Sequence, residues 1–485
     1  MPGNHFDLRD LAGPAAPAGV SAHGITADSR DVKAGDVFVA LAGSRADGMR
    51  FAVDAAGRGA VAIVGEAKRP PDLPAGTPYI QVSDARALLA RGAAMFFPRQ
   101  PENIVAVTGT NGKTSVVSFT RQIWAALGKP GASLGTLGVT TPKGEIKGSL
   151  TTPDPMALHR LLDQLAGKGV SHLAMEASSH GLDQRRLDGV KLAAGAFTNL
   201  TRDHLDYHKT LEAYRAAKLR LFDTLLPPGA AAIVNADSKE ASIIAAIAEK
   251  RGLRLILTGK SGRELQLRQV ERDGLREVLV VHADGKDHRI RLPLTGEFQI
   301  SNALIAAGLA IATGAKAGDA LAALESLQGA SGRLERVGDK NGAPVFVDYA
   351  HTPDALATAL DALRPYAKRL IVVFGCGGDR DPGKRPLMGE IAVRRADRVF
   401  VTDDNPRSED PAAIRRAILA AAPGAAEIGN RADAIKTAVA ELGPGDVLLV
   451  AGKGHETGQI VGDRTLPFSD HAEVRAALGM RKEIQ

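Results

Sequence analysis

The sequence contains a single cysteine among its 485 residues, so no disulfide can form within the chain. That usage is typical of a reducing compartment, and we expect a cytoplasmic protein. Long apolar runs are also missing: no stretch of about 18 apolar residues occurs, and we expect no membrane span. Residues 1–19 lack the basic start and apolar core of a secretory signal.

Aromatic residues make up only 4% of the chain, and neither sign of charge dominates. The 61 basic and 55 acidic residues are interspersed and give a net charge of +6. A nucleic-acid surface requires a basic stripe and stacking aromatic side chains, so we expect no nucleic-acid partner. A solvated surface with scattered anion-binding sites fits better, and phosphate-rich small substrates would use such sites.

Low-complexity tracts and solenoid repeats are absent as well. We do not expect a hydrolase with a Ser-His-Asp triad, although all three residue types occur, because the phosphate-binding loop described below has no role in that chemistry. The remaining composition, 44% hydrophobic and 24% charged, is that of an ordinary globular protein. The length predicts roughly three domains.

The most informative stretch is a glycine-rich turn between an apolar run at 104–107 and a helical pattern at 115–127. Its residues are Thr108, Gly109, Thr110, Asn111, Gly112, Lys113 and Thr114. A strand, a glycine-rich turn and a helix in this order are typical of a phosphate-binding loop, because backbone N–H groups and the helix N-terminus converge on the phosphate. Lys113 can reach the outer phosphates, and the Thr114 hydroxyl can bind Mg²⁺. The usual loop has a glycine where this chain has Val107, so the loop is a shortened variant.

We predict an α/β fold with three domains. Residues 1–98 would form a small N-terminal α/β domain, and residues 99–330 a central ATPase-like domain with a parallel sheet and the phosphate loop. Residues 331–485 would form a C-terminal Rossmann-like domain. The prolines of residues 97–101 end a helix and mark the first linker.

Hydrophobic periodicity places the elements of these domains. Strands are expected at 25–30, 36–41, 60–64, 79–82, 104–107, 172–175, 193–197, 230–234, 254–257, 345–348, 370–374, 398–401 and 447–450. Helices are expected at 51–58, 85–95, 115–127, 156–165, 211–226 and 302–312, and after each strand of the third domain. Residues 264–293 alternate apolar and polar residues around two Asp-Gly pairs, which predicts an antiparallel hairpin extension.

Three polar residues of the central domain are candidates for chemistry. Glu176 ends an apolar run and can bind Mg²⁺ or its waters, although a surface or capping acid fits equally well. His204 follows another strand within a crowded polar stretch, where it is either a metal ligand or a structural histidine. Lys218 lies on a predicted helix and, from its neighbours alone, is a solvated lysine.

The unusual clusters of the third domain all follow its strands, where open parallel sheets bind ligands. Arg380 and Arg407 are the most distinctive cationic residues of this domain. An arginine guanidinium binds a carboxylate through two parallel hydrogen bonds. A loop arginine in water is the alternative for both. Cys376 follows a strand and fits a small structural residue.

Together these motifs resemble the Mur ligases, the ATP-dependent amide-forming enzymes of peptidoglycan synthesis. The resemblance covers essentially the whole chain. Besides the phosphate loop, it includes residues 151–153, 176–180, 199–208, 332–335 and 348–351 and the helix around Asn302. Residues 404–407, Asp-Asn-Pro-Arg, are similar to the signature of the branch that adds meso-diaminopimelate to UDP-N-acetylmuramoyl-L-alanyl-D-glutamate, and residues 375–381 and 452–456 support that branch.

The resemblance implies four binding regions. The uridine end of the UDP-muramoyl-dipeptide would bind at Ser29, Ser44, Arg45 and Ala46, and its dipeptide at Thr151, Thr152, Ser178, Gln184 and Arg186. ATP would bind at Thr108, Gly109, Thr110, Asn111, Gly112, Lys113, Thr114, Asn302, Arg333 and Asp348. Diaminopimelate would bind at Arg380, Asp404, Asn405, Pro406, Arg407, Gly452 and Glu456.

The resemblance also implies the catalytic residues and the metal. Lys113, His204 and Lys218 would be catalytic, and Mg²⁺ would bind at Thr114, Glu176, His204 and Lys218. Lys218 matches a lysine that is carbamylated in this family, a change that turns a cation into a metal-binding carboxylate.

The implied reaction begins when the D-glutamate carboxylate attacks the γ-phosphorus of ATP and forms an acyl phosphate. The amine of diaminopimelate then attacks the activated carbonyl, so that the products are an amide, ADP and phosphate. We expect the protein to be a monomer. Three alternatives stay open: a lysine-adding ligase or folylpolyglutamate synthetase, a nucleic-acid-binding ATPase, and a non-catalytic nucleotide-binding module. The dispersed charge disfavours the second of these.

Overall fold

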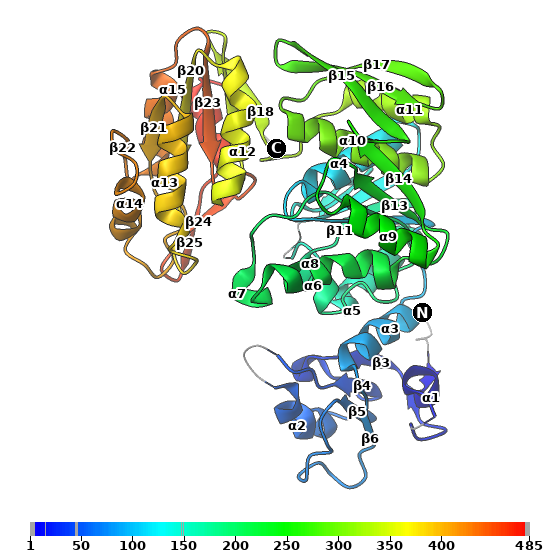
Figure 1. The fold of residues 1–485 in the computed structure, drawn as a ribbon. Helices are drawn as coiled ribbons and strands as arrows, with labels where there is room; N and C mark the ends of the chain where they lie inside the picture. The colour runs from blue at the N-terminus through cyan, green and yellow to red at the C-terminus, as the bar shows by residue number, and fades with distance from the viewer. Residues whose placement is uncertain (1–4, 15, 44–46, 147, 149, 481–485) are drawn as a thin grey trace.

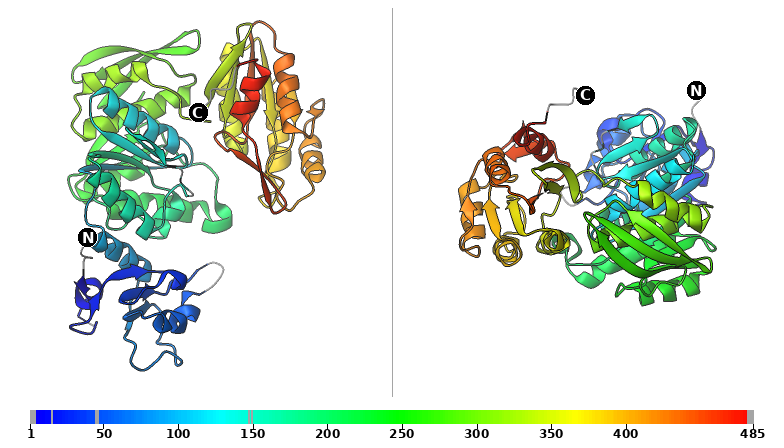
Figure 2. Two further views of the ribbon diagram at one scale, coloured as in Figure 1. Left: turned by 180° about the vertical axis from the view of Figure 1, so that it is seen from behind. Right: turned by 90° about the horizontal axis from the view of Figure 1, so that it is seen from above.

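The computed structural model describes residues 5–14, 16–43, 47–146, 148 and 150–480. Three α/β units follow one another along the chain, each built around its own sheet (Figure 1). The first unit, in blue, lies at one end of the central unit, and the last, yellow to red, lies beside the central unit's antiparallel extension in both opposed views (Figure 2). The predicted α/β class is confirmed.

The N-terminal unit is a four-stranded parallel sheet in the order β3-β4-β5-β6, with a two-stranded ribbon β1-β2 beside it. Its elements are β1 (Phe6–Asp7), α1 (Leu8–Ala12), β2 (Ser21–Ala22), β3 (Gly24–Thr26), β4 (Asp36–Val39), α2 (Ala52–Gly57), β5 (Ala62–Gly65), β6 (Tyr79–Gln81) and α3 (Ala85–Phe96). The strand expected at 25–30 is too long. Asp28 accepts a hydrogen bond from the Arg30 N–H and turns Ser29–Asp31 into a 3-10 helix.

The central unit contains a mixed sheet of eleven strands in the described residues, in the order β10-β9-β8-β11-β7-β12-β13-β14-β15-β16-β17. Its first half comprises β7 (Asn103–Thr108), α4 (Lys113–Ala126), β8 (Gly131–Gly135), β9 (Gly138–Thr141), β10 (Gly144–Ile146), α5 (Pro155–Gly167), β11 (His172–Glu176), α6 (Ser179–Asp183) and β12 (Leu192–Phe197). Its second half comprises α7 (Leu205–His208), α8 (Leu211–Arg220), β13 (Ala231–Asn235), α9 (Ala241–Arg251), β14 (Arg254–Gly259), β15 (Leu265–Asp273), β16 (Arg276–Ala283), β17 (Lys286–Leu292), α10 (Glu297–Ala312) and α11 (Ala317–Ala322).

The middle of this sheet is buried on both faces, which explains the unbroken apolar run of β7. Val105 and Val107 pack with helices α4 and α10 on one face, and Ile104 and Ala106 pack with α5 on the other. β11, β7 and β12 are parallel and in close register, with Glu176 opposite Val107 and Phe197 opposite Thr108. Their carboxyl ends therefore meet at one edge, where the phosphate loop begins.

The predicted hairpin extension is confirmed as three antiparallel strands, β15, β16 and β17. The turns lie at the two Asp-Gly pairs, where Gly274 and Gly285 have positive φ. The helix expected at 211–226 ends earlier as an α-helix, because α8 passes into a π-helical turn, Leu221–Leu225. The short strands β8, β9 and β10 were not predicted.

The C-terminal unit is a six-stranded sheet in the order β18-β19-β23-β20-β21-β22, parallel except for β18. Its elements are β18 (Glu335–Lys340), β19 (Ala343–Asp348), α12 (Pro353–Leu363), β20 (Arg369–Phe374), α13 (Lys384–Arg395), β21 (Arg398–Val401), α14 (Pro411–Leu419), β22 (Ala426–Glu427), α15 (Arg431–Ala440), β23 (Asp446–Ala451), β24 (Gly458–Val461), β25 (Arg464–Pro467) and α16 (Asp470–Ala477). The expectation of a helix directly after every strand is wrong for β23, which is followed by the hairpin β24-β25.

The central and C-terminal units contact each other through the tip of the β15–β16 hairpin. Leu275 and Phe298 pack against the C-terminal core, and the Tyr366 hydroxyl donates a 2.5 Å hydrogen bond to Glu277 Oε1. These contacts fix one wall of the cleft between the two units. In the described residues, no helix is both long and apolar enough to span a membrane.

Candidate active site

The phosphate loop contains two glycines at positions where a side chain would be both strained and too close to its neighbours. Gly109 has φ +138°, and a Cβ there would lie 1.9 Å from Thr198 Oγ1. Gly112 has φ +86°, and a Cβ there would lie 2.5 Å from Asn302 Oδ1. Both glycines are needed because positive φ and close packing coincide.

The irregular segment that follows β12 supports the loop from one side. Thr110 N–H donates to the Asn199 carbonyl, and Asn111 N–H donates to Asn199 Oδ1, both at 2.9 Å. The Thr198 hydroxyl donates to the Asn111 carbonyl at 2.6 Å. These contacts hold the loop open at the start of α4, with the geometry of an anion site at a helix N-terminus.

Two lysines converge on one carbonyl of the loop. Lys113 Nζ donates to the Gly109 carbonyl at 2.9 Å, and Lys218 Nζ donates to the same oxygen at 2.7 Å. Burial lowers the pKa of both ammonium groups. The pKa of Lys218 is well below its usual value, because burial lowers it and the neighbouring Lys113 cation lowers it further. The interpretation of Lys218 as a solvated lysine is wrong, because its side chain is buried against Gly109 and the Tyr214 ring.

Thr114 and Glu176 bring two oxygen ligands together at the start of α4. The Thr114 hydroxyl donates to Glu176 Oε1 at 2.9 Å, and Glu176 is only 1% exposed, so the surface-acid alternative is wrong. Thr136 N–H and its hydroxyl donate to the same carboxylate. A hydroxyl beside a carboxylate fits a Mg²⁺ ion bound together with phosphate oxygens.

The residues expected to hold the dipeptide form one hydrogen-bonded cluster next to Glu176. Thr152 donates to the Glu176 carbonyl, and Arg186 Nη1 donates to the Thr152 carbonyl at 2.7 Å. Arg186 Nη2 also donates to Gln184 Oε1 at 2.8 Å. Thr151 Oγ1 lies 3.0 Å from Thr136 Oγ1, and Ser178 caps α6 beside the same cluster.

His204 lies in a separate aromatic cluster rather than against the Thr114–Glu176 pair. It has φ +52° and a half-exposed ring, 5.0 Å from the His180 ring and 6.2 Å from the Tyr214 ring. In the described residues, no group of three His, Cys, Asp or Glu side chains has the geometry of a metal site. His204 and Lys218 both lie beside the Tyr214 ring, and the role of His204 as a metal ligand stays a prediction.

A cleft of about 1070 Å³ separates the phosphate loop from the C-terminal unit. Five of the residues expected at ATP line it: Asn111, Gly112, Asn302, Arg333 and Asp348. Arg333, in the segment between the two units, reaches both sides. Its Nη2 donates to Thr114 Oγ1 at 3.3 Å, and its guanidinium lies 4.5 Å from the Tyr349 ring centre.

Asp348, at the end of β19, holds the segment between the units in place. Its two oxygens accept hydrogen bonds from the N–H groups of Leu334 and Ala350, at 2.6 and 2.7 Å. Burial raises the pKa of Asp348 to about 6, although Arg333 and both hydrogen bonds favour the charged form.

The predicted diaminopimelate residues meet at the carboxyl ends of β20, β21 and β23. Asn405 Nδ2 donates to Glu456 Oε2 at 2.9 Å, and Arg407 Nη1 donates to the Gly378 carbonyl at 2.8 Å. A Cβ on Gly452 would lie 2.7 Å from Asp404 Oδ2. Pro406 is buried within the same turn.

Cys376, which follows β20, is buried beside Met388, and burial raises the pKa of its thiol to about 12, as expected of a structural residue.

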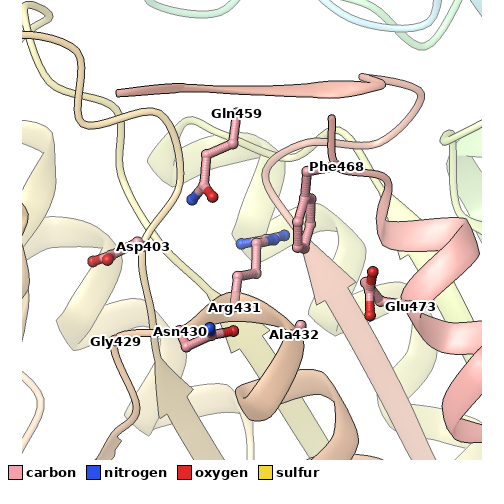
Figure 3. Close-up of a pocket in the computed structure, with 8 residues that line it drawn as sticks. All are labelled: Asp403, Gly429, Asn430, Arg431, Ala432, Gln459, Phe468 and Glu473. Carbon is pink, nitrogen blue, oxygen red and sulfur yellow. The ribbon is translucent and has the colours of Figure 1, made fainter. Parts of the chain in front are cut away.

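A second, smaller cavity of about 400 Å³ lies beside this cluster (Figure 3). Arg431 and Gln459 extend into the view from below and above, and the Phe468 ring stands beside the guanidinium. Arg431 is buried and pairs with Asp470 at 2.7 Å. Gln459 donates to the Asp404 carbonyl, so this cavity borders the back of the predicted amino-acid site. Arg380, by contrast, is exposed and donates to the Asp379 carbonyl at 3.0 Å.

Comparison with known proteins decides the family. The model described as "Mur ligase family, catalytic domain" matches residues 21–97, "Mur ligase middle domain" matches residues 107–310, and "Mur ligase, glutamate ligase domain" matches residues 332–454. A UDP-N-acetylmuramoyl-L-alanyl-D-glutamate–2,6-diaminopimelate ligase of Bradyrhizobium diazoefficiens is 59% identical over 484 residues, with 98% of this chain and 99% of the relative covered. The chain belongs to the Mur ligase family.

Solved structures of other proteins have the same fold as this Mur ligase. A structure titled UDP-N-acetylmuramoyl-L-alanyl-D-glutamate–2,6-diaminopimelate ligase has a TM-score of 0.72 and 31% identity, covering 98% of this chain and 99% of its own. A folylpolyglutamate synthase of Mycobacterium tuberculosis, complexed with ADP and AMPPCP, has a TM-score of 0.64, covering 82% and 96%. At 18% identity, that second likeness shows the fold alone.

The uridine-binding predictions lie in the N-terminal unit of this Mur ligase. Ser29 is buried in the 3-10 helix after β3. Ser44, Arg45 and Ala46 lie outside the described residues. The N-terminal and central units are joined by an ion pair from Arg185 to Asp84, at 3.0 Å, close to the cluster around Arg186.

Sequence reasoning missed four residues that contact or adjoin the predicted site residues. Thr136 bonds to Glu176, Tyr349 stacks on Arg333, Arg431 pairs with Asp470, and Lys453 bonds to Asn405 and Glu456. Lys453 and Tyr349 lie inside the matched motifs, but no pattern distinguishes them from their neighbours. Thr136 and Arg431 lie outside the motifs, and only the fold reveals them.

Proposed function

We propose that this Mur ligase joins meso-diaminopimelate to the D-glutamate of UDP-N-acetylmuramoyl-L-alanyl-D-glutamate, with hydrolysis of ATP to ADP and phosphate. The observation that carries the proposal is 59% identity, over nearly the whole chain, to a ligase named for this reaction with 2,6-diaminopimelate. The product is a peptidoglycan precursor, and we propose that the enzyme acts in the cytoplasm as a monomer. Every proposed site residue belongs to one chain.

ATP would lie along the cleft, with its phosphates on the loop from Thr108 to Thr114. Asn302, Arg333 and Asp348 line the same cleft and would contact the nucleotide. Lys113 would neutralise the charge that develops on the transferred phosphoryl group. Its ammonium already has two carbonyl partners, which orient it toward the loop.

Thr114 and Glu176 would hold Mg²⁺, and Lys218 would join them as a carbamate. The ion supplies charge neutralisation at the phosphates when it is bound. The lowered pKa of Lys218 supports the carbamate, because only a neutral amine reacts with carbon dioxide. His204 completes the proposed set, although it contacts none of the other three in the structure.

The acceptor would bind across the N-terminal and central units. Ser29 and residues 44–46 would hold the uridine end, and the hydrogen-bonded cluster of Thr151, Thr152, Ser178, Gln184 and Arg186 would hold the dipeptide. This cluster lies directly beside Glu176, so the D-glutamate carboxylate would face the γ-phosphate. That placement suits an in-line attack on phosphorus.

Diaminopimelate would bind at the strand ends of the C-terminal unit. Arg407 and Arg380 would take its distal carboxylate, and Asp404, Asn405, Gly452 and Glu456 would take the distal ammonium, with Pro406 shaping the turn. The remaining amine would attack the acyl phosphate and expel phosphate. Closure of the C-terminal unit over the loop would bring the two sites together and exclude water.

Phosphate release with purified protein tests this function. With ATP, Mg²⁺ and UDP-N-acetylmuramoyl-L-alanyl-D-glutamate, we expect release that depends on meso-diaminopimelate and is far slower with lysine. Release with lysine alone would support a lysine-adding ligase, and release with folate and glutamate a folylpolyglutamate synthetase. Hydrolysis stimulated by DNA or RNA, or no acceptor-dependent release, would overturn the proposal.

A further inference from the structure

Lys453 is a buried lysine in the turn after β23, and the proposed reaction gives it no role. Its side chain is fully buried. The turn is possible because glycine precedes and follows it, with φ +119° at Gly452 and +51° at Gly454. A Cβ on Gly454 would lie 2.8 Å from Tyr349 Cβ. The tight turn therefore places the lysine inside the protein, whereas most lysines lie on the surface.

The Lys453 ammonium binds two of the residues assigned to diaminopimelate. Its Nζ donates to Asn405 Oδ1 and to Glu456 Oε2, both at 3.0 Å. Asn405 Oδ1 also accepts from the Ile460 N–H at 2.9 Å. With its oxygen bound to two donors, the Asn405 amide has one orientation, with Nδ2 toward Glu456.

The buried and half-buried charges around Lys453, Asn405 and Glu456 balance before any substrate binds; Arg380 is exposed and is not among them. The cations are Lys453 and Arg407, and the anions are Glu456 and Asp404, which is 8% exposed. The nearby Arg431 is neutralised by Asp470. A diaminopimelate molecule brings a distal ammonium and a distal carboxylate, so its distal end has no net charge. Lysine brings only the ammonium and would leave the pocket with an excess positive charge.

We propose that Lys453 is a specificity-determining residue, which positions Asn405 and Glu456 and sets the pocket's charge so that a zwitterionic distal end is preferred over a cationic one. This inference rests on the proposed function. Without the Lys453 ammonium, Glu456 would be an uncompensated carboxylate at the distal position. Such a carboxylate attracts a lone ammonium more strongly than a zwitterion.

Lys453→Met tests the proposal, with Lys436→Met on the exposed face of α15 as the matched control. The measurement is kcat/KM for diaminopimelate and for lysine, with calorimetric binding where turnover is too slow. We expect the preference for diaminopimelate over lysine to fall about tenfold or more in K453M. The KM for ATP should not change, and K436M should match the parent.

Glu456→Gln provides the opposite change, and Glu456 is partly exposed, so this variant does not depend on replacing a buried ammonium. It leaves the Lys453 charge uncompensated, and the preference for diaminopimelate over lysine should rise. A merely structural role for Lys453 would lower use of both amino acids equally in K453M. An unchanged preference in K453M, or a lowered preference in E456Q, would overturn the inference while the proposed function stands. A parent enzyme that does not use diaminopimelate would overturn both.

Discussion

Three ionisable side chains around the phosphate loop and the cleft have pKa values that the fold shifts from their usual range. Burial lowers the pKa of Lys113 and Lys218 and raises that of Asp348 to about 6. Each has a hydrogen-bond partner from the phosphate loop or from the segment joining the central and C-terminal units. Perturbed groups gathered around a phosphate loop are typical of a catalytic site.

The pKa of Asp348 predicts that activity falls at acid pH while the protein stays folded. Its folded pKa, about 6, is above its ordinary value of 3.8, so its contribution to stability is fullest below pH 3.8 and is lost as the pH rises through 6. Protonation therefore does not destabilise the fold through this group, but it removes a charge facing Arg333. We expect kcat/KM for ATP to fall below pH 6 while circular dichroism is unchanged.

Asp348→Asn is the matching variant, because it removes the titrating group and keeps a similar shape. Its kcat/KM for ATP should be low at all pH values, with no step near pH 6. A parent-like step near pH 6 in the variant would assign the acid limit to another group.

Arg407 is predicted to act on the amino acid and not on the nucleotide. Arg407→Ala should lower kcat/KM for diaminopimelate about a hundredfold or more, because the distal carboxylate loses a charge-assisted partner. The KM for ATP should stay within about twofold. Arg394→Ala, on an exposed face of α13, is the control. Equal turnover by R407A and the parent would remove Arg407 from the site.

At the scale of elements, the phosphate loop depends on its contact with α10. Gly112→Ala would place a Cβ 2.5 Å from Asn302 Oδ1 at a positive φ, so both the loop and Asn302 must move. We expect the KM for ATP to rise about tenfold or more. Gly57→Ala, in α2, meets no atom within 4 Å and should leave ATP kinetics unchanged. A parent-like KM in G112A would show that this packing does not matter for nucleotide binding.

Elements with strong local signals could be predicted from the sequence. β7 and α4 flank a glycine-rich turn, and the two Asp-Gly pairs mark the turns of β15–β17. The 3-10 helix at Ser29 was missed because a single capping side chain, Asp28, decides it. Two-residue strands such as β22 have too few residues to show a period.

The candidate site was predictable where motifs are local and not where distant segments meet. Lys218 lies on a helix with polar neighbours, yet it packs against Gly109, more than a hundred residues earlier. Lys453 meets Asn405, which follows a different strand. Only the parallel register of the sheets brings such residues together, and no local pattern carries that information.

At the scale of the whole molecule, the C-terminal unit is attached to the β15–β16 hairpin through a partly buried hydrogen bond. Tyr366→Phe would leave Glu277 Oε1 without the hydroxyl that donates to it, and Glu277 Oε2 already has no partner in the described residues. We expect a loss of about 1–3 kcal/mol, measured as a melting temperature lower by a few degrees.

The double variant Y366F with Glu277→Met is the control, because it also removes the Glu277 carboxylate that Y366F leaves without its donor. Replacing both partners by apolar groups should recover most of the lost melting temperature. A single Y366F variant as stable as the parent would mean that this contact does not hold the two units together.

The central claim is that ATP makes the acceptor's carboxylate electrophilic within the cleft between the central and C-terminal units. The most direct measurement uses UDP-N-acetylmuramoyl-L-alanyl-D-glutamate with a heavy oxygen isotope in the reacting carboxylate, incubated with ATP and diaminopimelate. We predict that one labelled oxygen appears in the released phosphate for each amide formed. Phosphate without the label, released at the same rate as the amide, would contradict an acyl-phosphate route and with it the proposed mechanism.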